Sequence, residues 1–178
     1  DALRQQFETN VFGTQELTNL VLPYMRNRNN GRIIQISSVL GFVCLKYRGA
    51  YNASKYALEA LTDTMRLELG DTAIRFSLIE PGPISSRFRE NAYQKFIEHV
   101  DVSNSAHQDN YSVLEDRFKS GSPAKFTLPS EAVAKAVLHA LESRNPKIRY
   151  RITLPTKVMA PMKRFLPDRL MDKFLSRS

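Results

Sequence analysis

The chain has 178 residues, of which 42% are hydrophobic and 25% charged, and this composition is typical of a globular domain with a real core. The single cysteine, Cys44, excludes an intrachain disulfide and favours a reducing, cytoplasmic setting, and no apolar run reaches the roughly 18 residues of a membrane span. The net charge of +8 lies entirely in residues 144–178, which carry ten of the 26 basic and two of the 18 acidic residues.

Helix and strand patterns alternate through the first part of the chain. Apolar residues at helical spacing predict a helix over residues 2–25, and a turn at 27–31 leads to a β-branched run at 32–37 that predicts a buried strand. A loop then leads to a second long amphipathic helix over residues 50–70, with Gly70 placed to end it.

The second part of the chain continues this alternation after an irregular stretch. Residues 73–82 predict a strand that ends at Pro81 and Gly82, and residues 83–129 predict irregular structure with one short helix inside it. The remaining expected elements are a helix with Ser130 as N-cap, a strand and a broken amphipathic tail, at residues 129–143, 147–154 and 160–178.

Helices that alternate with strands predict an α/β fold with a parallel sheet, in which the strands follow one another in chain order. We expect one domain over residues 1–178, with the catalytic helices and strands at 1–86, a substrate loop or lid at 87–129, and the last helix, strand and basic tail at 130–178. In such sheets the chemistry sits at the carboxyl ends of the strands.

Tyr51 and Lys55 stand one turn apart at the start of the second predicted helix. Residues at i and i+4 share a helix face, and a nearby ammonium lowers the pKa of a phenol from about 10. Such a tyrosine can give a proton to a carbonyl or take one from an alcohol. This spacing alone also occurs in helices without a function, but Ser38 at a predicted strand end could hold the same substrate oxygen.

Four motifs in this order resemble the short-chain dehydrogenase/reductase family, in its short single-domain branch. GRIIQISSVLG resembles the strand that leads to the active-site serine, here Ser38, and YNASK resembles the Tyr-x-x-x-Lys motif. NVFG resembles the position of the active-site asparagine, here Asn10, and PGPI resembles the Pro-Gly turn of the family. SLIEPGPI, KFTLPSEAV and PDRLMDKFL are most similar to bacterial NADP-dependent aldehyde reductases, near the 17β-hydroxysteroid and retinol dehydrogenases.

The resemblance implies a role for each of these residues. Tyr51 would be the catalytic acid–base, Lys55 would lower its pKa and bind the nicotinamide ribose, and Ser38 would orient the substrate carbonyl. Asn10 would hold a water in a proton relay that ends at Lys55. The implied contacts to NADP, with NAD as the other candidate, are Tyr51, Lys55, Pro81, Gly82, Ile84 and Ser86, the last of which stands where the family usually has threonine.

The strand and Gly-rich turn with which the family cradles the pyrophosphate have no counterpart in the sequence. We therefore expect the chain to hold the C-terminal portion of a Rossmann-type doubly wound parallel sheet, with the N-terminal dinucleotide-binding half absent. One edge of the sheet would then be exposed.

Other residues support weaker interpretations. The three histidines have no cysteine or carboxylate partners at metal-ligand spacing, so we expect no metal site. Cys44 would line the substrate mouth rather than act as a nucleophile, because no paired histidine is evident. Phe88 and the apolar residues after it predict either a mobile lid or ordinary core. The two long helices suit the interface of a homodimer or homotetramer, although core packing explains their stripes nearly as well.

The sequence therefore favours an oxidoreductase that transfers a hydride between NADP(H) and the carbonyl or alcohol carbon of an apolar aldehyde, ketone or secondary alcohol. One alternative is a truncated remnant that keeps the motif residues but does not bind cofactor. Another is a module whose basic tail, residues 144–178, makes peripheral contact with a membrane or binds nucleic acid, although a solvated face explains the charge as well. We expect no nucleic-acid partner, because that alternative leaves the motif residues without a role.

Overall fold

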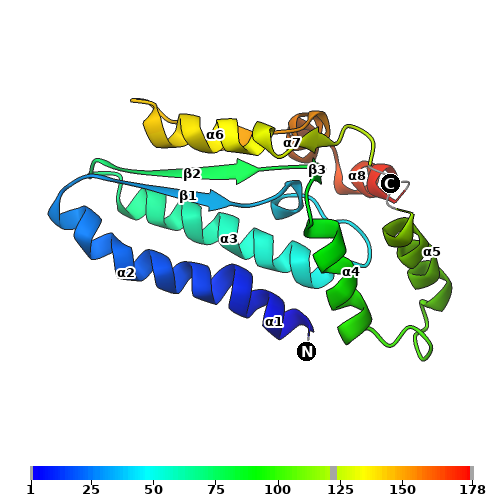
Figure 1. Cartoon of the computed structure of the whole chain (residues 1–178). Helices are drawn as coiled ribbons and strands as arrows, with labels where there is room; N and C mark the ends of the chain where they lie inside the picture. The colour runs from blue at the N-terminus through cyan, green and yellow to red at the C-terminus, as the bar shows by residue number, and fades with distance from the viewer. Residues whose placement is uncertain (1, 121–123, 177–178) are drawn as a thin grey trace.

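The computed structural model describes residues 2–120 and 124–176 (Figure 1). Residues 1, 121–123 and 177–178, among them Arg177 of the predicted basic tail, lie outside the described residues. The helical elements are α1 (Ala2–Phe7), η1 (Glu8–Phe12), α2 (Gly13–Asn27), η2 (Val39–Gly41), α3 (Gly49–Glu68), α4 (Phe88–His99), α5 (Gln108–Lys119), α6 (Glu131–Glu142), α7 (Leu154–Phe165) and α8 (Asp168–Leu175).

Three parallel strands form the centre of the fold. They are β1 (Gly31–Ile36), β2 (Ile74–Glu80) and β5 (Arg149–Arg151), in the order β1-β2-β5. Ile33 lies opposite Phe76, and Ile79 lies opposite Tyr150. The predicted α/β class and the strand order are confirmed, whereas the expected absence of an N-terminal half stays a prediction.

Helices cover both faces of this sheet. Figure 1 shows α2 and α3 below the strands and α6 above them. The lower core contains Ile33, Met65, Leu69, Ile74 and Phe76. The upper core contains Ile79, Ala136, Ala140 and Tyr150. Because apolar side chains fill both faces, β2 is buried along nearly its whole length, as expected for the central strand of a parallel sheet.

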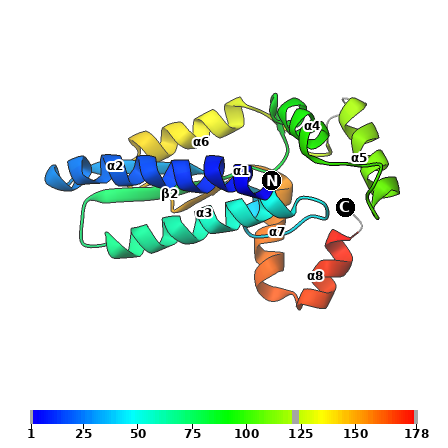
Figure 2. The ribbon, with the colours of Figure 1, turned by 90° about the horizontal axis from the view of Figure 1, so that it is seen from below.

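A third core lies between the C-terminal helices and the loop that follows β1. Leu40, Val43 and Met171 are buried together there, so α8 is joined to the loop that follows β1. Figure 2 shows α7 and α8 as a V-shaped pair at one side of the sheet. Pro167 separates the two helices, which matches the predicted broken tail. Within the described residues, no helix combines the length and apolar character that crossing a membrane requires.

The first predicted helix differs from the expectation in its details. It runs from Ala2 to Asn27 with one π-helical segment, Glu8–Phe12, in its path. Leu17 and Leu20, which the spacing suggests as part of the apolar stripe, are 63% and 64% exposed. They point away from the sheet, so core packing within the described chain does not account for them.

The stretch predicted as irregular is more ordered than its sequence suggests. It contains two helices, α4 and α5, rather than one, and a small parallel pair of β3 (Ile84–Ser85) with β4 (Leu128–Pro129). The short helix expected at Phe88 and the apolar residues after it is α4, whereas α5 was not predicted. Part of this stretch, residues 121–123, lies outside the described residues.

Two details near the end of the chain also differ from the prediction. The last strand covers only Arg149–Arg151, because β2 stops before Pro81, which has no N–H to donate, and α7 begins at Leu154. Ser130 stands before α6 as predicted, but its side chain makes no capping hydrogen bond.

Candidate active site

The carboxyl ends of β1 and β2 are held together just beyond the sheet. The Ser37 backbone N–H donates to the carbonyl of Ile79, and that of Val39 donates to the carbonyl of Pro81, both at 2.8 Å. Ser38 lies between these bonds, is buried, and accepts a hydrogen bond from the Leu40 N–H at 3.1 Å. The structure therefore brings Ser38 and Pro81 to the same end of the sheet.

Tyr51 and Lys55 lie on the face of α3 that looks toward this end of the sheet. The Lys55 Nζ is 5.7 Å from the centre of the Tyr51 ring, so the predicted pairing on one face is confirmed. Lys55 is only 9% exposed, and its ammonium donates to the Ile36 carbonyl at 2.8 Å. This bond ties the lysine to the last residue of β1, a contact that spacing alone does not indicate.

The pKa values of this pair differ from the expectation. Burial raises the pKa of Tyr51 above its ordinary value of 10.0, while the Ser38 hydroxyl and the positive charge of Arg48 act in the lowering direction. Burial also lowers the pKa of Lys55 to about 8, partly offset by Glu59. The expected lowering of the tyrosine pKa is therefore wrong for this structure, because the loss of hydration outweighs the favourable charges. The sequence alone did not identify Arg48, three residues before Tyr51, as a charge that acts on the phenol.

Asn10 reaches the same turn of α3 from the π-helical segment. Its Nδ2 donates to the Ser54 Oγ at 3.1 Å, and that hydroxyl donates to the Tyr51 carbonyl at 2.9 Å. Single π-helical turns within α-helices are frequent at functional sites, where they re-aim side chains. Asn10 is therefore joined to the helix that carries Tyr51 by two successive hydrogen bonds.

The Pro-Gly turn after β2 is closely packed. A methyl group on Gly82 would collide with the hydroxyls of Thr153 and Thr156, so this position has room only for glycine. Ile84 pairs with Leu128 in the small sheet. The Ser86 Oγ accepts from the Phe88 N–H at 3.3 Å and so helps to start α4.

Phe88 is the first residue of α4 and lies against the predicted catalytic tyrosine. The centres of the Phe88 and Tyr51 rings are 5.5 Å apart and the rings are tilted by 58°. Farther along, Phe96 of α4 packs on Tyr111 and Phe118 of α5. The Phe88 ring therefore covers one side of the tyrosine.

Cys44, which was expected to line the substrate mouth, is exposed.

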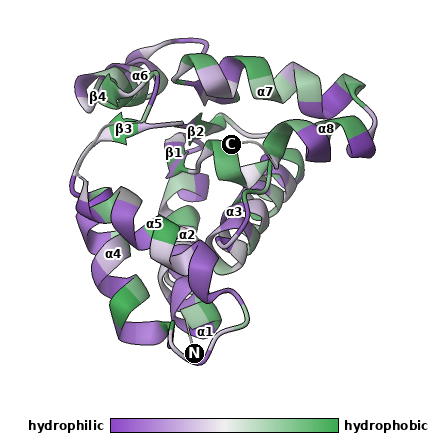
Figure 3. Cartoon of the chain, turned by 90° about the vertical axis from the view of Figure 1, so that its right-hand side faces the viewer, coloured by the Kyte–Doolittle hydropathy of each residue, from purple (hydrophilic) through white to green (hydrophobic). Residues whose placement is uncertain are grey.

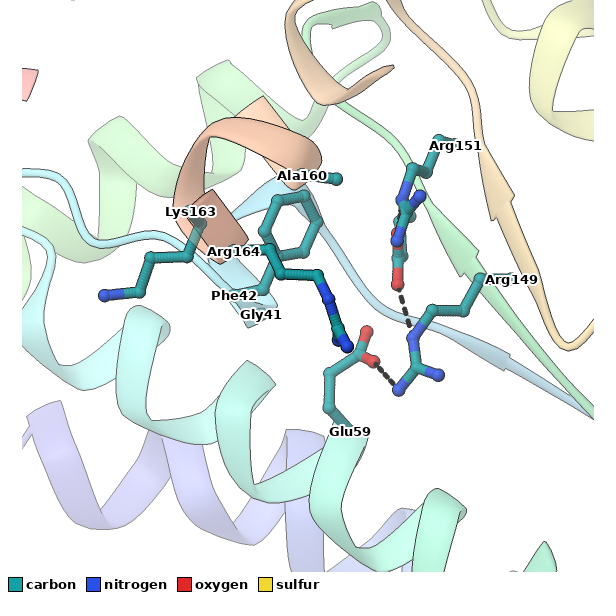
Figure 4. Close-up of a pocket in the computed structure, with 9 residues that line it drawn as sticks. Gly41, Phe42, Glu59, Arg149, Arg151, Ala160, Lys163 and Arg164 are labelled. Carbon is teal, nitrogen blue, oxygen red and sulfur yellow. Dashed lines mark hydrogen bonds and ion pairs between the residues drawn. The ribbon is translucent and has the colours of Figure 1, made fainter. Parts of the chain in front are cut away.

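A partly buried ionic network joins the later turns of α3 to the sheet (Figure 4). The Arg149 Nη2 lies 3.2 Å from the Glu59 Oε2 and 2.6 Å from the Asp63 Oδ2, and its Nε lies 3.0 Å from the Glu80 Oε1. Arg151 also pairs with Glu80, at 3.2 Å. Two arginines counted in the basic tail are therefore neutralised by acidic residues of the preceding elements.

A cavity of about 350 Å³ opens beside this network. Its walls include Phe42 of the loop after β1 and Lys163 and Arg164 of α7 (Figure 4). Burial raises the pKa of Glu59 to about 7, although Arg149 opposes the shift. No pattern in the sequence indicates the ionic network of Arg149, Glu59, Asp63 and Glu80, because these residues come from separate segments of the chain. Within residues 2–120 and 124–176, no group of three or more histidine, cysteine or acidic residues is placed to hold a metal ion.

Comparison with known proteins identifies relatives of this chain. A family model described as short chain dehydrogenase matches residues 1–96. The uncharacterized oxidoreductase YbbO of Escherichia coli strain K12 is 44% identical over 173 residues, which cover 97% of this chain and 58% of the relative. The NADPH-dependent 3-dehydrocapnine reductase of Ornithobacterium rhinotracheale is 34% identical over 178 residues, which cover 97% of this chain and 61% of the relative. The chain thus spans about three fifths of the length of these curated relatives.

The fold has a counterpart among solved structures. The crystal structure of a short chain dehydrogenase from Burkholderia cenocepacia J2315, in complex with NADP, matches with a TM-score of 0.70 at 22% identity. The match covers 97% of this chain and 58% of that chain. It shows that the parallel sheet and its flanking helices have the same arrangement in both proteins. Since the family model covers more than half of the residues, the chain belongs to the short-chain dehydrogenase/reductase family.

Proposed function

We propose that this chain supplies the catalytic residues of an oxidoreductase that transfers a hydride between NADP(H) and the carbonyl or alcohol carbon of an apolar substrate. The observation that carries the proposal is the placement of Ser38, Tyr51 and Lys55 at the carboxyl end of β1. Lys55 lies over the Tyr51 ring, and a hydrogen bond with the Ser38 hydroxyl partly offsets the rise in the pKa of the phenol that burial causes. Three polar groups thus converge where an open α/β sheet places its ligands.

Tyr51 is assigned as the proton donor to the substrate oxygen. Its raised pKa keeps the phenol protonated at neutral pH, which suits the reduction of a carbonyl better than the oxidation of an alcohol. Ser38 would donate to the same oxygen and hold it beside the phenol. Asn10 would support the tyrosine through Ser54, so its role is to position the helix turn that carries Tyr51.

The donor groups of the site fit a nicotinamide nucleotide, which supplies the hydride when it is bound. The Lys55 ammonium has three donors, and one of them is used by the Ile36 carbonyl, so two remain for the hydroxyls of a ribose. The Ser86 hydroxyl accepts from Phe88 and keeps its own proton for a carboxamide oxygen. No residue of this chain is assigned to the pyrophosphate, because no Gly-rich turn follows a strand in the sequence.

The choice of substrate and coenzyme rests on two observations. Phe88 against Tyr51 provides an aromatic wall, which favours an apolar aldehyde or ketone and makes residues 87–129 the proposed lid. NADP is favoured over NAD because the relative with 34% identity is described as NADPH-dependent. The preference for aldehydes is carried over from the resemblance to bacterial aldehyde reductases.

We further propose that the protein assembles as a homodimer or homotetramer and works in the cytoplasm. Leu17, Leu20 and Tyr24 of α2 and Leu67 of α3 are exposed apolar side chains on the two long helices, which supports an interface there. The cytoplasmic setting is supported by the single, exposed Cys44.

The experiment that tests the proposed function measures NADPH oxidation by the purified protein with a panel of apolar aldehydes, beside the Tyr51→Phe variant. Removal of a general acid typically lowers the rate by about 10²–10⁴-fold. A parallel fluorescence titration with NADPH should give similar affinities for both proteins. If neither NADPH nor NADH binds and no aldehyde turns over, the chain is a remnant that keeps the motif without its activity.

A further inference from the structure

An apolar stripe runs along the outer side of α7. Leu154, Val158, Pro161 and Phe165 are spaced by four, three and four residues, so they share one face of the helix. All four are exposed, and Phe165, at the end of the helix, is 78% exposed. Figure 3 shows α7 at the margin of the molecule, with hydrophobic segments along it.

The opposite side of α7 already makes the contacts that hold the helix in place. Met159 and Met162 pack against the core of Leu40 and Val43, and Thr156 is fully buried. The stripe therefore faces solvent, and other residues of α7 supply the contacts that hold the helix in place. Surface helices normally present polar residues on that side, so an exposed apolar stripe indicates an interaction surface.

The neighbouring helix α8 repeats this arrangement. Met171 and Leu175 face the core, whereas Leu170 and Phe174, one turn apart, are 53% and 45% exposed. Arg169 and Lys173 each precede one of these apolar residues and are themselves exposed. Because consecutive residues of a helix are rotated by about 100°, the two cations lie along one flank of the apolar pair.

Charge decides which kind of partner fits this surface. From Leu154 to Leu175, the two helices carry five basic residues, of which Lys157 flanks the α7 stripe, and two acidic residues, Asp168 and Asp172. Lys163 is paired with Asp168 at 3.3 Å. Lysine and arginine beside exposed leucine and phenylalanine are typical of helices that lie in the headgroup layer of an anionic membrane. Their long stems can reach the headgroups while the apolar side chains enter the lipid.

We propose that α7 and α8 bind the surface of an anionic lipid bilayer, with Val158, Phe165 and Phe174 in the lipid and Lys157, Arg169 and Lys173 at the headgroups. A second copy of the chain fits less well, because a two-fold contact through the same stripe brings the cations of both copies together. The proposal is independent of the proposed reaction, since it involves none of the residues assigned to the active site.

The test measures co-sedimentation of the purified protein with vesicles of phosphatidylcholine alone and of phosphatidylcholine mixed with phosphatidylserine. We expect binding to the mixed vesicles only, and weaker binding as salt is raised. Lys157→Gln and Lys173→Gln should each weaken it about five-fold, the value of one cation at an anionic surface. The double variant Val158→Ser/Phe165→Ser should weaken it by about tenfold or more.

Matched controls lie outside α7 and α8. Arg26→Gln and Arg28→Gln remove exposed cations from the C-terminal end of α2, and Leu138→Ser/Leu141→Ser removes two exposed apolar residues of α6. These variants should bind vesicles like the unchanged protein. Equal losses in the controls, or equal binding to both kinds of vesicle, would overturn the proposal. So would an absence of vesicle binding together with a dimer that Val158→Ser/Phe165→Ser dissociates, since the stripe would then serve a second copy.

Discussion

Arg149 on the edge strand β5 binds Glu59 on α3, with 3.2 Å between the guanidinium Nη2 and the carboxylate Oε2. The same guanidinium reaches Asp63 on the next turn of the helix. The strand that ends the sheet therefore fixes the helix that carries Tyr51 and Lys55. This contact joins residues 90 positions apart in the sequence.

Replacement of Arg149 should destabilise the fold. In Arg149→Met, the carboxylates of Glu59 and Asp63 lose their guanidinium partner, and Glu80 keeps only Arg151. Breaking a buried ion pair from one side costs about 3–5 kcal/mol, and the partial exposure of Arg149 places the expected loss near the lower value. Urea denaturation measures it. Arg28→Met, on the exposed end of α2, should stay within about 0.5 kcal/mol of the unchanged protein.

The Glu59 carboxyl should make stability fall with rising pH. Its pKa is about 7 in the folded protein against 4.5 in the reference state, so between these values the folded state binds more protons than the unfolded state. Its contribution to stability is greatest below pH 4.5 and is lost as pH rises to 7. Unfolding free energies measured across this range should show a negative slope, which Glu59→Gln should reduce. An equal slope in the variant would assign the effect to other groups.

The binding of coenzyme should weaken above the pKa of Lys55. That pKa is about 8, so the ammonium loses its proton, and part of its donor capacity, at mildly alkaline pH. A fluorescence titration with NADPH should show the loss of affinity above pH 8. Lys55→Arg keeps its charge at higher pH, so the affinity of this variant for NADPH, even if lower, should not change with pH through this range. A similar decline in Lys55→Arg would contradict the assignment.

A larger residue at Gly82 should destabilise the fold. The added methyl group of Gly82→Ala meets the hydroxyls of Thr153 and Thr156, and overpacking of this kind costs about 1–3 kcal/mol. The double variant Gly82→Ala/Thr153→Ala should recover part of the loss, because it removes the nearer hydroxyl. Gly49→Ala is the control, since no atom lies within 4 Å of its added methyl group. Thermal unfolding followed by circular dichroism compares the three.

The framework of the fold could be predicted because its signals are local. The β-branched runs of β1 and β2 and the long helical spacing of α3 each lie within one segment, and the handedness rule then orders the strands. The short helix α4 was predicted from its apolar residues, whereas α5 was not, since its sequence QDNYSVLEDRFK has few apolar residues among the polar and charged ones.

The candidate site was only partly visible in the sequence. The spacing of Tyr51 and Lys55 fixes their common face, because four residues make about one helical turn. It carries no information on burial, and burial decides the direction of the tyrosine pKa. The Arg149 contacts were hidden for a different reason. Ion pairs between distant segments leave no pattern in either segment, so Arg149 and Arg151 were counted with the basic tail.

The two helices that meet at Tyr51 are anchored to very different degrees. Seven side chains of α3 between Asn52 and Met65 are buried, and Arg149 fastens the helix to the sheet, whereas α4 buries none. Local opening needs the least free energy where few side chains are buried. We therefore expect a molecule that approaches Tyr51 to gain entry by displacement of α4 and its Phe88 ring, while α3 and the strands stay in place as a rigid body. Access to the site and its alignment are thus governed by separate parts of the chain.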